Sequence, residues 1–183
     1  MQDESLTAFH EAGHVVAAHL LGRPRVREVT IEPGERSFGG VTLEESIDIE
    51  GAATRDHANV EDDIVYLLAG WEAAARASGH PQGFPRGTDG FHAESLAYEI
   101  QPAEHVEKYL LRVQQRAREL VSREDVWRSI QLCQGALSAG KRRVVSSSSH
   151  HRTHRSERDA VFAQRGGGGA LGALSRTECL TPC

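Results

Sequence analysis

The chain has 183 residues, of which 39% are hydrophobic and 26% charged, a balance typical of one globular domain of ordinary size. It contains no apolar run near the roughly 20 residues that a membrane-spanning helix needs, and its acidic, polar start indicates no secretory leader. The three cysteines all follow residue 132 and offer no disulfide framework, so we expect a reducing, cytoplasmic location.

Charge and composition divide the chain near residue 140. Residues 1–140 contain 23 acidic and 13 basic residues, a net charge of -10, whereas residues 141–183 contain 3 acidic and 8 basic residues, a net charge of +5. The second part includes four consecutive serines and four consecutive glycines, and it is too poor in large apolar residues to offset the entropy of ordering. We therefore predict a domain over 1–140 and a disordered basic tail over 141–183. The acidic body argues against nucleic acid as a partner.

The first elements expected are one helix followed by two short strands. A helix is predicted from Asp3 or Ser5 to a stop at Gly22, with apolar residues near a helical repeat. The β-branched segment 26–31 predicts a strand, and residues 38–43 predict a second one, interrupted by glycines.

The remaining elements are all predicted to be helical. Asn59 is expected to cap a helix that ends near Gly79, and a loop rich in proline and glycine follows. Three more helices are expected at about 90–100, at 106–120 and from Ser122 onward. The fold class predicted is mainly α (α+β), with a small β element beside the first helix.

The first predicted helix carries His10-Glu11-Ala12-Gly13-His14, which matches the pattern H-E-x-x-H. Residues i and i+4 lie on one face of a helix, roughly 5–6 Å apart at Cβ, so the two imidazoles can converge on one zinc ion. The glutamate projects beside that pair, where it can accept a proton from water activated by the metal. The small residues between the histidines would let another backbone segment approach closely.

A catalytic zinc site needs a third protein ligand and an open position for water. His19 follows His14 by five residues and should point away from the pair. Asp89 follows a glycine-rich loop at the start of a helix, which suits a ligand, but the sequence alone favours an ordinary helix cap. The spacing alone leaves these candidates open: His19, His57, Glu72, His80, Asp89, His92 and Glu94.

The segment Thr7–Ala17 around this motif resembles the zinc helix in the peptidase domain of the FtsH-type ATP-dependent zinc metalloproteases. Later segments resemble that family in the same order, and the resemblance covers about residues 5–139. It implies that His10 and His14 are zinc ligands, that Asp89 is the third ligand and that Glu11 is the catalytic base. The further matching segments are 28–33, 36–42, 63–74, 87–97 and the closing helix with Trp127 and Ile130.

The resemblance also implies a substrate-binding edge strand near Gly39, Gly40 and Val41, where an extended peptide could add as a further strand. Members of that family join the peptidase domain to an ATPase module and usually to membrane helices, and this sequence has neither. We therefore expect no ATP-driven unfolding within the chain itself, and a separate ATPase or unfoldase would have to supply it.

Two functions remain open at this stage. The first is a zinc metalloendopeptidase that cuts unfolded or flexible polypeptides, alone, as an oligomer or with a separate ATPase. The second is a non-catalytic zinc-binding domain that recruits peptides through its edge strand. The presence of Glu11 favours the first, because a domain without catalysis has no chemical need for a carboxylate beside the metal.

Overall fold

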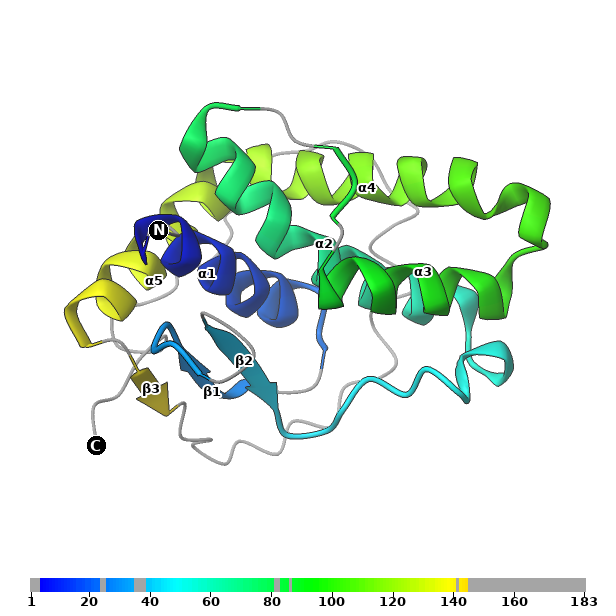
Figure 1. Ribbon diagram of the computed structural model, residues 1–183, viewed down its shortest axis with the longest axis horizontal. Helices are drawn as coiled ribbons and strands as arrows, with labels where there is room; N and C mark the ends of the chain where they lie inside the picture. Colours follow the sequence, from blue (N-terminus) through cyan, green and yellow to red (C-terminus); the bar gives the residue numbers. More distant parts are fainter. Residues whose placement is uncertain are drawn as a thin grey trace, which may run out of the picture.

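We describe the protein from a computed structural model, which covers residues 4–23, 26–34, 39–80, 83–85, 87–140 and 142–144. Most of these residues are helical and a small sheet completes the fold, which confirms the predicted fold class (Figure 1). The elements in chain order are α1 (Glu4–Leu20), β1 (Val26–Thr30), β2 (Gly40–Leu43), the short 3-10 helix η1 (Ala52–Thr54), α2 (His57–Ser78), α3 (Thr88–Ile100), the 3-10 helix η2 (Ala103–His105), α4 (Val106–Ser122), α5 (Glu124–Gly140) and β3 (Arg142–Val144).

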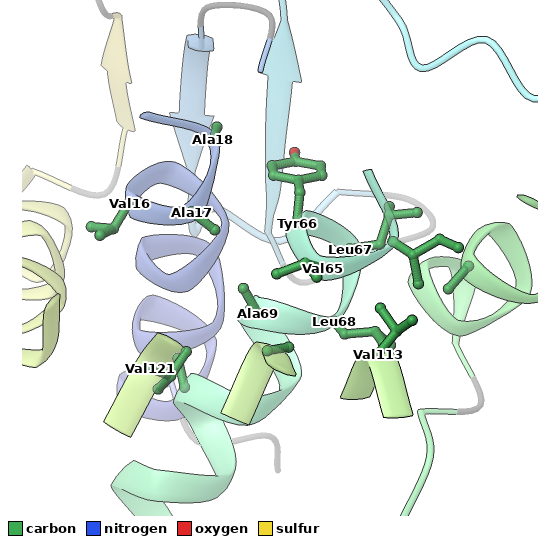
Figure 2. Close-up of a cluster of buried hydrophobic side chains, with 14 of the residues drawn as sticks. Val16, Ala17, Ala18, Val65, Tyr66, Leu67, Leu68, Ala69, Val113 and Val121 are labelled. Atoms are coloured by element: carbon green, nitrogen blue, oxygen red, sulfur yellow. The ribbon is translucent and has the colours of Figure 1, made fainter. Parts of the chain in front are cut away.

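The core lies where α1 packs against α2. Ala17 of α1 points toward α2, whose Val65, Leu68 and Ala69 fill the space between α1 and α4, while Val16 points to the opposite side, toward α5 (Figure 2). Small residues let the two helices approach closely. A Cβ added at Gly13 would lie 2.7 Å from the Ala69 carbonyl oxygen and 2.9 Å from the Gly70 Cα, so only glycine fits at this crossing.

The sheet is antiparallel and has the strand order β2-β1-β3. A register shift between Val26 and Glu28 breaks the alternation of β1, so that Val26 and Val29 are both buried although they are three residues apart. This buried face packs against α1, and the sheet lies beside that helix in Figure 1. The prediction of a small β element beside the first helix is therefore confirmed.

Strand β3 lies beyond the boundary predicted at residue 140. Residues 142–144 were assigned to the disordered tail, but they pair with Thr30, Val29 and Glu28 of β1. Composition could not indicate this, because the pairing uses backbone groups along the free edge of β1 rather than apolar side chains. Residues 145–183, which make up the rest of the predicted tail, lie outside the described residues.

Two helix starts differ from the predicted ones. Helix α2 begins at His57 rather than after Asn59, because the Asp56 carboxylate accepts a hydrogen bond of 3.0 Å from the Ala58 backbone N–H and caps the helix there. Its end is as predicted, with Gly79 in the left-handed conformation at φ 69°. Helix α3 begins at Thr88, so Asp89 lies in its first turn instead of preceding it.

Candidate metal centre

Three side chains from two distant helices converge on one point. The Nε2 atoms of His10 and His14, which lie one turn apart on α1, are 3.1 Å from each other. The Asp89 Oδ2 atom at the start of α3 is 3.1 Å from the His10 Nε2 and 3.3 Å from the His14 Nε2. Within the described part of the chain, these three residues form the group of histidine, cysteine and acidic side chains that could hold a metal ion.

A backbone carbonyl fixes the state of the His14 ring. The His14 Nδ1 donates a hydrogen bond of 2.9 Å to the Tyr66 carbonyl oxygen on α2. With its proton on Nδ1, a neutral imidazole presents a bare lone pair at Nε2, directed at the other two candidate ligands. Asp89 contributes a second acceptor at the same point. Acceptors gathered in this way need a cation between them, or a proton, to avoid repulsion.

The spacing of the three atoms is close to that of ligands around one metal ion. Nitrogen and oxygen ligands of a tetrahedral zinc lie about 2.0–2.2 Å from the metal, which places neighbouring ligand atoms roughly 3.3–3.6 Å apart. The three distances here are 3.1, 3.1 and 3.3 Å. A fourth corner would remain for water or substrate, and the His10 and Asp89 side chains are 26% and 31% exposed.

The electrostatics of Asp89 favour its ionised form. Burial acts to raise the pKa of its carboxyl, but the hydrogen bonds to His10 and His14, together with the positive charge that these rings carry when protonated, outweigh burial and hold that pKa well below its usual range. Asp89 is also free to act as a ligand because it does not cap its helix. Gly87 occupies the cap position of α3, and no side chain caps that end.

Glu11 lies buried beside the two histidines. Only 6% of its surface is exposed, and a Cβ added at Gly39 would lie 2.7 Å from its Oε1 atom. Burial raises the pKa of this carboxyl to about 7; the nearby His10 acts to lower the pKa and Asp89 to raise it. The arrangement gives a buried carboxyl group beside the two histidines that could hold a metal ion.

The structure does not bring the other ligand candidates to this point. His19, His57, His80 and Glu94 are exposed, and His92 is half-buried on α3. Glu72 is buried, but its carboxylate is paired with Arg118 at 2.9 Å and lies outside the His10, His14 and Asp89 group.

The predicted substrate edge begins beside Glu11. Gly39 lies against the glutamate, and Gly40 and Val41 open strand β2, which is a terminal strand of the described sheet. Reasoning from the sequence missed two groups around His14. Gly70 lies directly under the His14 ring, and a glycine inside an apolar helix is a signal of close approach. The Tyr66 carbonyl, as a backbone group, leaves no signal in the sequence.

No protein-family model matches the chain. A segment of 70 residues is 43% identical to the ATP-dependent zinc metalloprotease FtsH 1 of Thermoanaerobacter sp. (strain X514). The match covers 38% of this chain and 11% of that protein, so the chain corresponds to about a tenth of its relative's length. This supports a relation to the FtsH proteases over that segment. None of the helices in the described ranges is long and apolar enough to cross a membrane.

Proposed function

We propose that the chain is a zinc metalloendopeptidase that hydrolyses peptide bonds in unfolded or flexible polypeptides. The observation that carries this proposal is the convergence of the His10, His14 and Asp89 ligand atoms at 3.1–3.3 Å, next to the buried Glu11. The similarity of a segment to a zinc metalloprotease supports the same chemistry.

In this proposal His10, His14 and Asp89 hold the metal. When bound, zinc supplies Lewis acidity, which makes water acidic enough to lose a proton near neutral pH and polarises a peptide carbonyl. Glu11 accepts a proton from water while the water oxygen adds to the peptide carbonyl carbon. Glu11 then passes that proton to the leaving amine nitrogen as the C–N bond breaks. Tyr66 holds His14 in the tautomer that directs Nε2 inward.

Strand β2 supplies the substrate edge in this proposal. An extended peptide that paired with Gly40 and Val41 would run past Gly39, which lies against Glu11. Pairing of this kind reads backbone more than side chains, so we expect broad sequence preference and a strict need for an extended substrate.

The test measures metal and cleavage together. The purified full chain should contain about one zinc by elemental analysis and should cut an unstructured fluorogenic peptide. A chelator should abolish cleavage and added zinc should restore it. Glu11→Gln should keep the zinc and lose cleavage, whereas Glu94→Gln, at an exposed carboxylate on α3, should keep both. Cleavage that survives complete removal of metal would refute the proposal.

The second candidate is a non-catalytic zinc-binding domain that recruits peptides. Its support is the terminal position of β2 in the described sheet. The same assays separate the two functions, because this candidate predicts zinc and peptide binding with no cleavage by the parent chain and no effect of Glu11→Gln on binding.

We also propose that folded substrates require a separate ATPase or unfoldase. The relative's name describes an ATP-dependent enzyme, and unfolding a typical domain takes about 5–15 kcal/mol, which a zinc cleft does not supply. The purified chain should therefore cut an unstructured peptide equally well with and without ATP, and should leave a stable folded domain intact. ATP stimulation of the purified chain would contradict this.

A further inference from the structure

A short segment, Gly83–Pro85, precedes α3 and is held by side chains from two other helices. The Trp71 indole Nε1 on α2 donates a hydrogen bond of 2.8 Å to the Gly83 carbonyl oxygen. The Gln114 side-chain Nε2 on α4 donates a second, longer one of 3.4 Å to the same oxygen. Phe84 packs against the core and Pro85 is buried. The segment is thus held against α2 and α4, although Gly83 itself is exposed.

Gln114 is a buried polar residue on the otherwise apolar face of α4. Its amide nitrogen donates one hydrogen bond to the Glu72 Oε1 at 2.8 Å and the other to the Gly83 carbonyl. Both partners are acceptors, so the amide must present its nitrogen here and cannot be turned around. Gln114 is 5% exposed, and a buried amide without partners would be costly.

Glu72 fixes the orientation of that amide. Its carboxylate is 4% exposed and accepts hydrogen bonds from the Arg118 Nε at 2.9 Å and Nη2 at 3.3 Å. Arg118 neutralises the buried charge of Glu72. Because one N–H of the Gln114 amide is bonded to Glu72, the other N–H is directed at the Gly83 carbonyl. Trp71, Glu72, Gln114 and Arg118 therefore act as one connected clamp on Gly83, which we call the Gly83 clamp.

The segment Gly83–Pro85 is in close contact with the first turn of α3, which carries Asp89. The Pro85 carbonyl lies so close to Gly90 that an added Cβ would fall within 2.7 Å of the Pro85 carbonyl carbon and would overlap its oxygen. Gly90 is the residue after Asp89, and both belong to the first turn of α3. A shift of Pro85 would therefore be transmitted to Asp89 through direct backbone contact.

We propose that the Gly83 clamp positions the third proposed metal ligand, so that its four residues together set the place of Asp89 relative to His10 and His14. This inference rests on the proposed metal site. Asp89 is the one ligand that does not lie on α1, so its distance from the other two depends on how α3 is docked. The clamp fixes that docking at the end of α3 where the ligand lies.

A purely structural role predicts a different result from a positioning role. If the clamp only stabilises the fold, its loss lowers the melting temperature of the metal-free chain and leaves the metal affinity of the folded chain unchanged. If it positions Asp89, the folded chain itself binds metal more weakly and in a different geometry. Metal affinity and the visible absorption of bound Co²⁺, which reports coordination geometry, therefore separate the two roles without any activity assay.

The experiment uses the full chain and the double variant Trp71→Phe, Gln114→Leu, which removes both donors to Gly83 and keeps apolar bulk. The control is Gln115→Leu, the same change one residue further along α4, where the amide is exposed and bonds only to Glu119 at 2.9 Å among the contacts described. Each protein is first checked for folding by thermal melting without metal. Zinc affinity is then measured by competition with a chromophoric chelator, and Co²⁺ spectra are recorded.

We expect the double variant to bind zinc about ten-fold or more weakly, in the range seen when groups supporting a metal ligand are removed, and to show altered Co²⁺ bands. The control should stay within about two-fold of the parent in affinity. If the double variant does not fold, Trp71→Phe alone decides, with a smaller loss expected. Parent-like affinity and Co²⁺ spectrum in the folded variant would overturn the inference. A parent chain that binds neither metal would refute the proposed function as well.

Discussion

The contact between Gly70 and His14 makes the metal centre sensitive to a single methyl group. A Cβ added at Gly70 would lie 2.7 Å from the His14 Cδ2 and 2.8 Å from its Cε1, and closer still to Nε2. Carbon atoms in ordinary contact stay about 3.5–4.0 Å apart, so Gly70→Ala requires the imidazole or the helix to move. Helices α1 and α2 have little freedom to adjust at this crossing, because Gly13 of α1 already lies in close contact with the backbone of α2.

Two opposing effects set the size of the change in stability. Alanine in place of glycine favours a helix by about 1 kcal/mol, whereas overpacking a core costs about 1–3 kcal/mol. If the His14 ring rotates to avoid the added methyl group, its hydrogen bond of 2.9 Å to the Tyr66 carbonyl is broken, which costs about 1 kcal/mol. We expect Gly70→Ala to destabilise the metal-free chain by about 1–2 kcal/mol and to weaken zinc binding about 10- to 100-fold.

Gly135→Ala is the matched control. Gly135 lies within α5, and an added Cβ there would meet nothing within 4 Å, so only the gain in helix preference applies. It should raise stability by about 0.5–1 kcal/mol, which corresponds to an increase in melting temperature of roughly 2–4 °C, with no change in zinc affinity. Thermal melting and chelator competition measure both quantities. Zinc affinity of Gly70→Ala equal to that of Gly135→Ala would refute the reasoning.

Four further outcomes are expected. Asp89→Ala should lose zinc in elemental analysis, and full retention would remove that residue from the site. Chelation should lower the melting temperature of the parent, since a ligand at 100 times its Kd stabilises by about 2.7 kcal/mol. Asp63→Ala, which leaves two arginines without their buried partner, should cost about 3–5 kcal/mol in chemical denaturation, against at most about 1 kcal/mol for the exposed Arg112→Ala. Deleting 145–183 should leave the melting temperature unchanged, whereas a deletion that also removes 142–144 should lower it by exposing the edge of β1.

The geometry of a single helix was sufficient to predict the part of the candidate site that lies on α1. The spacing of His10 and His14 places both rings on one face of α1 whatever the rest of the chain does, and the structure has their Nε2 atoms 3.1 Å apart. The small residue between them predicted a close neighbour, and Gly13 indeed meets the backbone of α2. Helix ends marked by a single strong signal, such as Gly79, were also predicted correctly.

The third proposed ligand could not be chosen from helix geometry. Asp89 is 75 residues from His14 in the chain, and its spacing carries no information about distance in space. The sequence alone favoured a helix cap at Asp89, and only the structure shows that Gly87 takes that position. The predicted start of α2 was wrong for a related reason. Asp56 and Asn59 are both good caps, and the competition between them was decided by the hydrogen bond that Asp56 makes to Ala58.

Two signals of non-local contacts that our sequence analysis did not use are residues that conflict with the pattern of their own helix. Gly70 interrupts a buried apolar helix and Gln114 interrupts the apolar face of α4, and each costs stability where it stands unless something else requires it. Gly70 makes room for the His14 ring, and Gln114 fixes the segment that leads to Asp89. Local conflicts of this kind are expected where a chain gives up stability for a site. In this chain both conflicts bear on the candidate ligands, because Gly70 admits the His14 ring and, in our proposal, Gln114 docks the helix that carries Asp89.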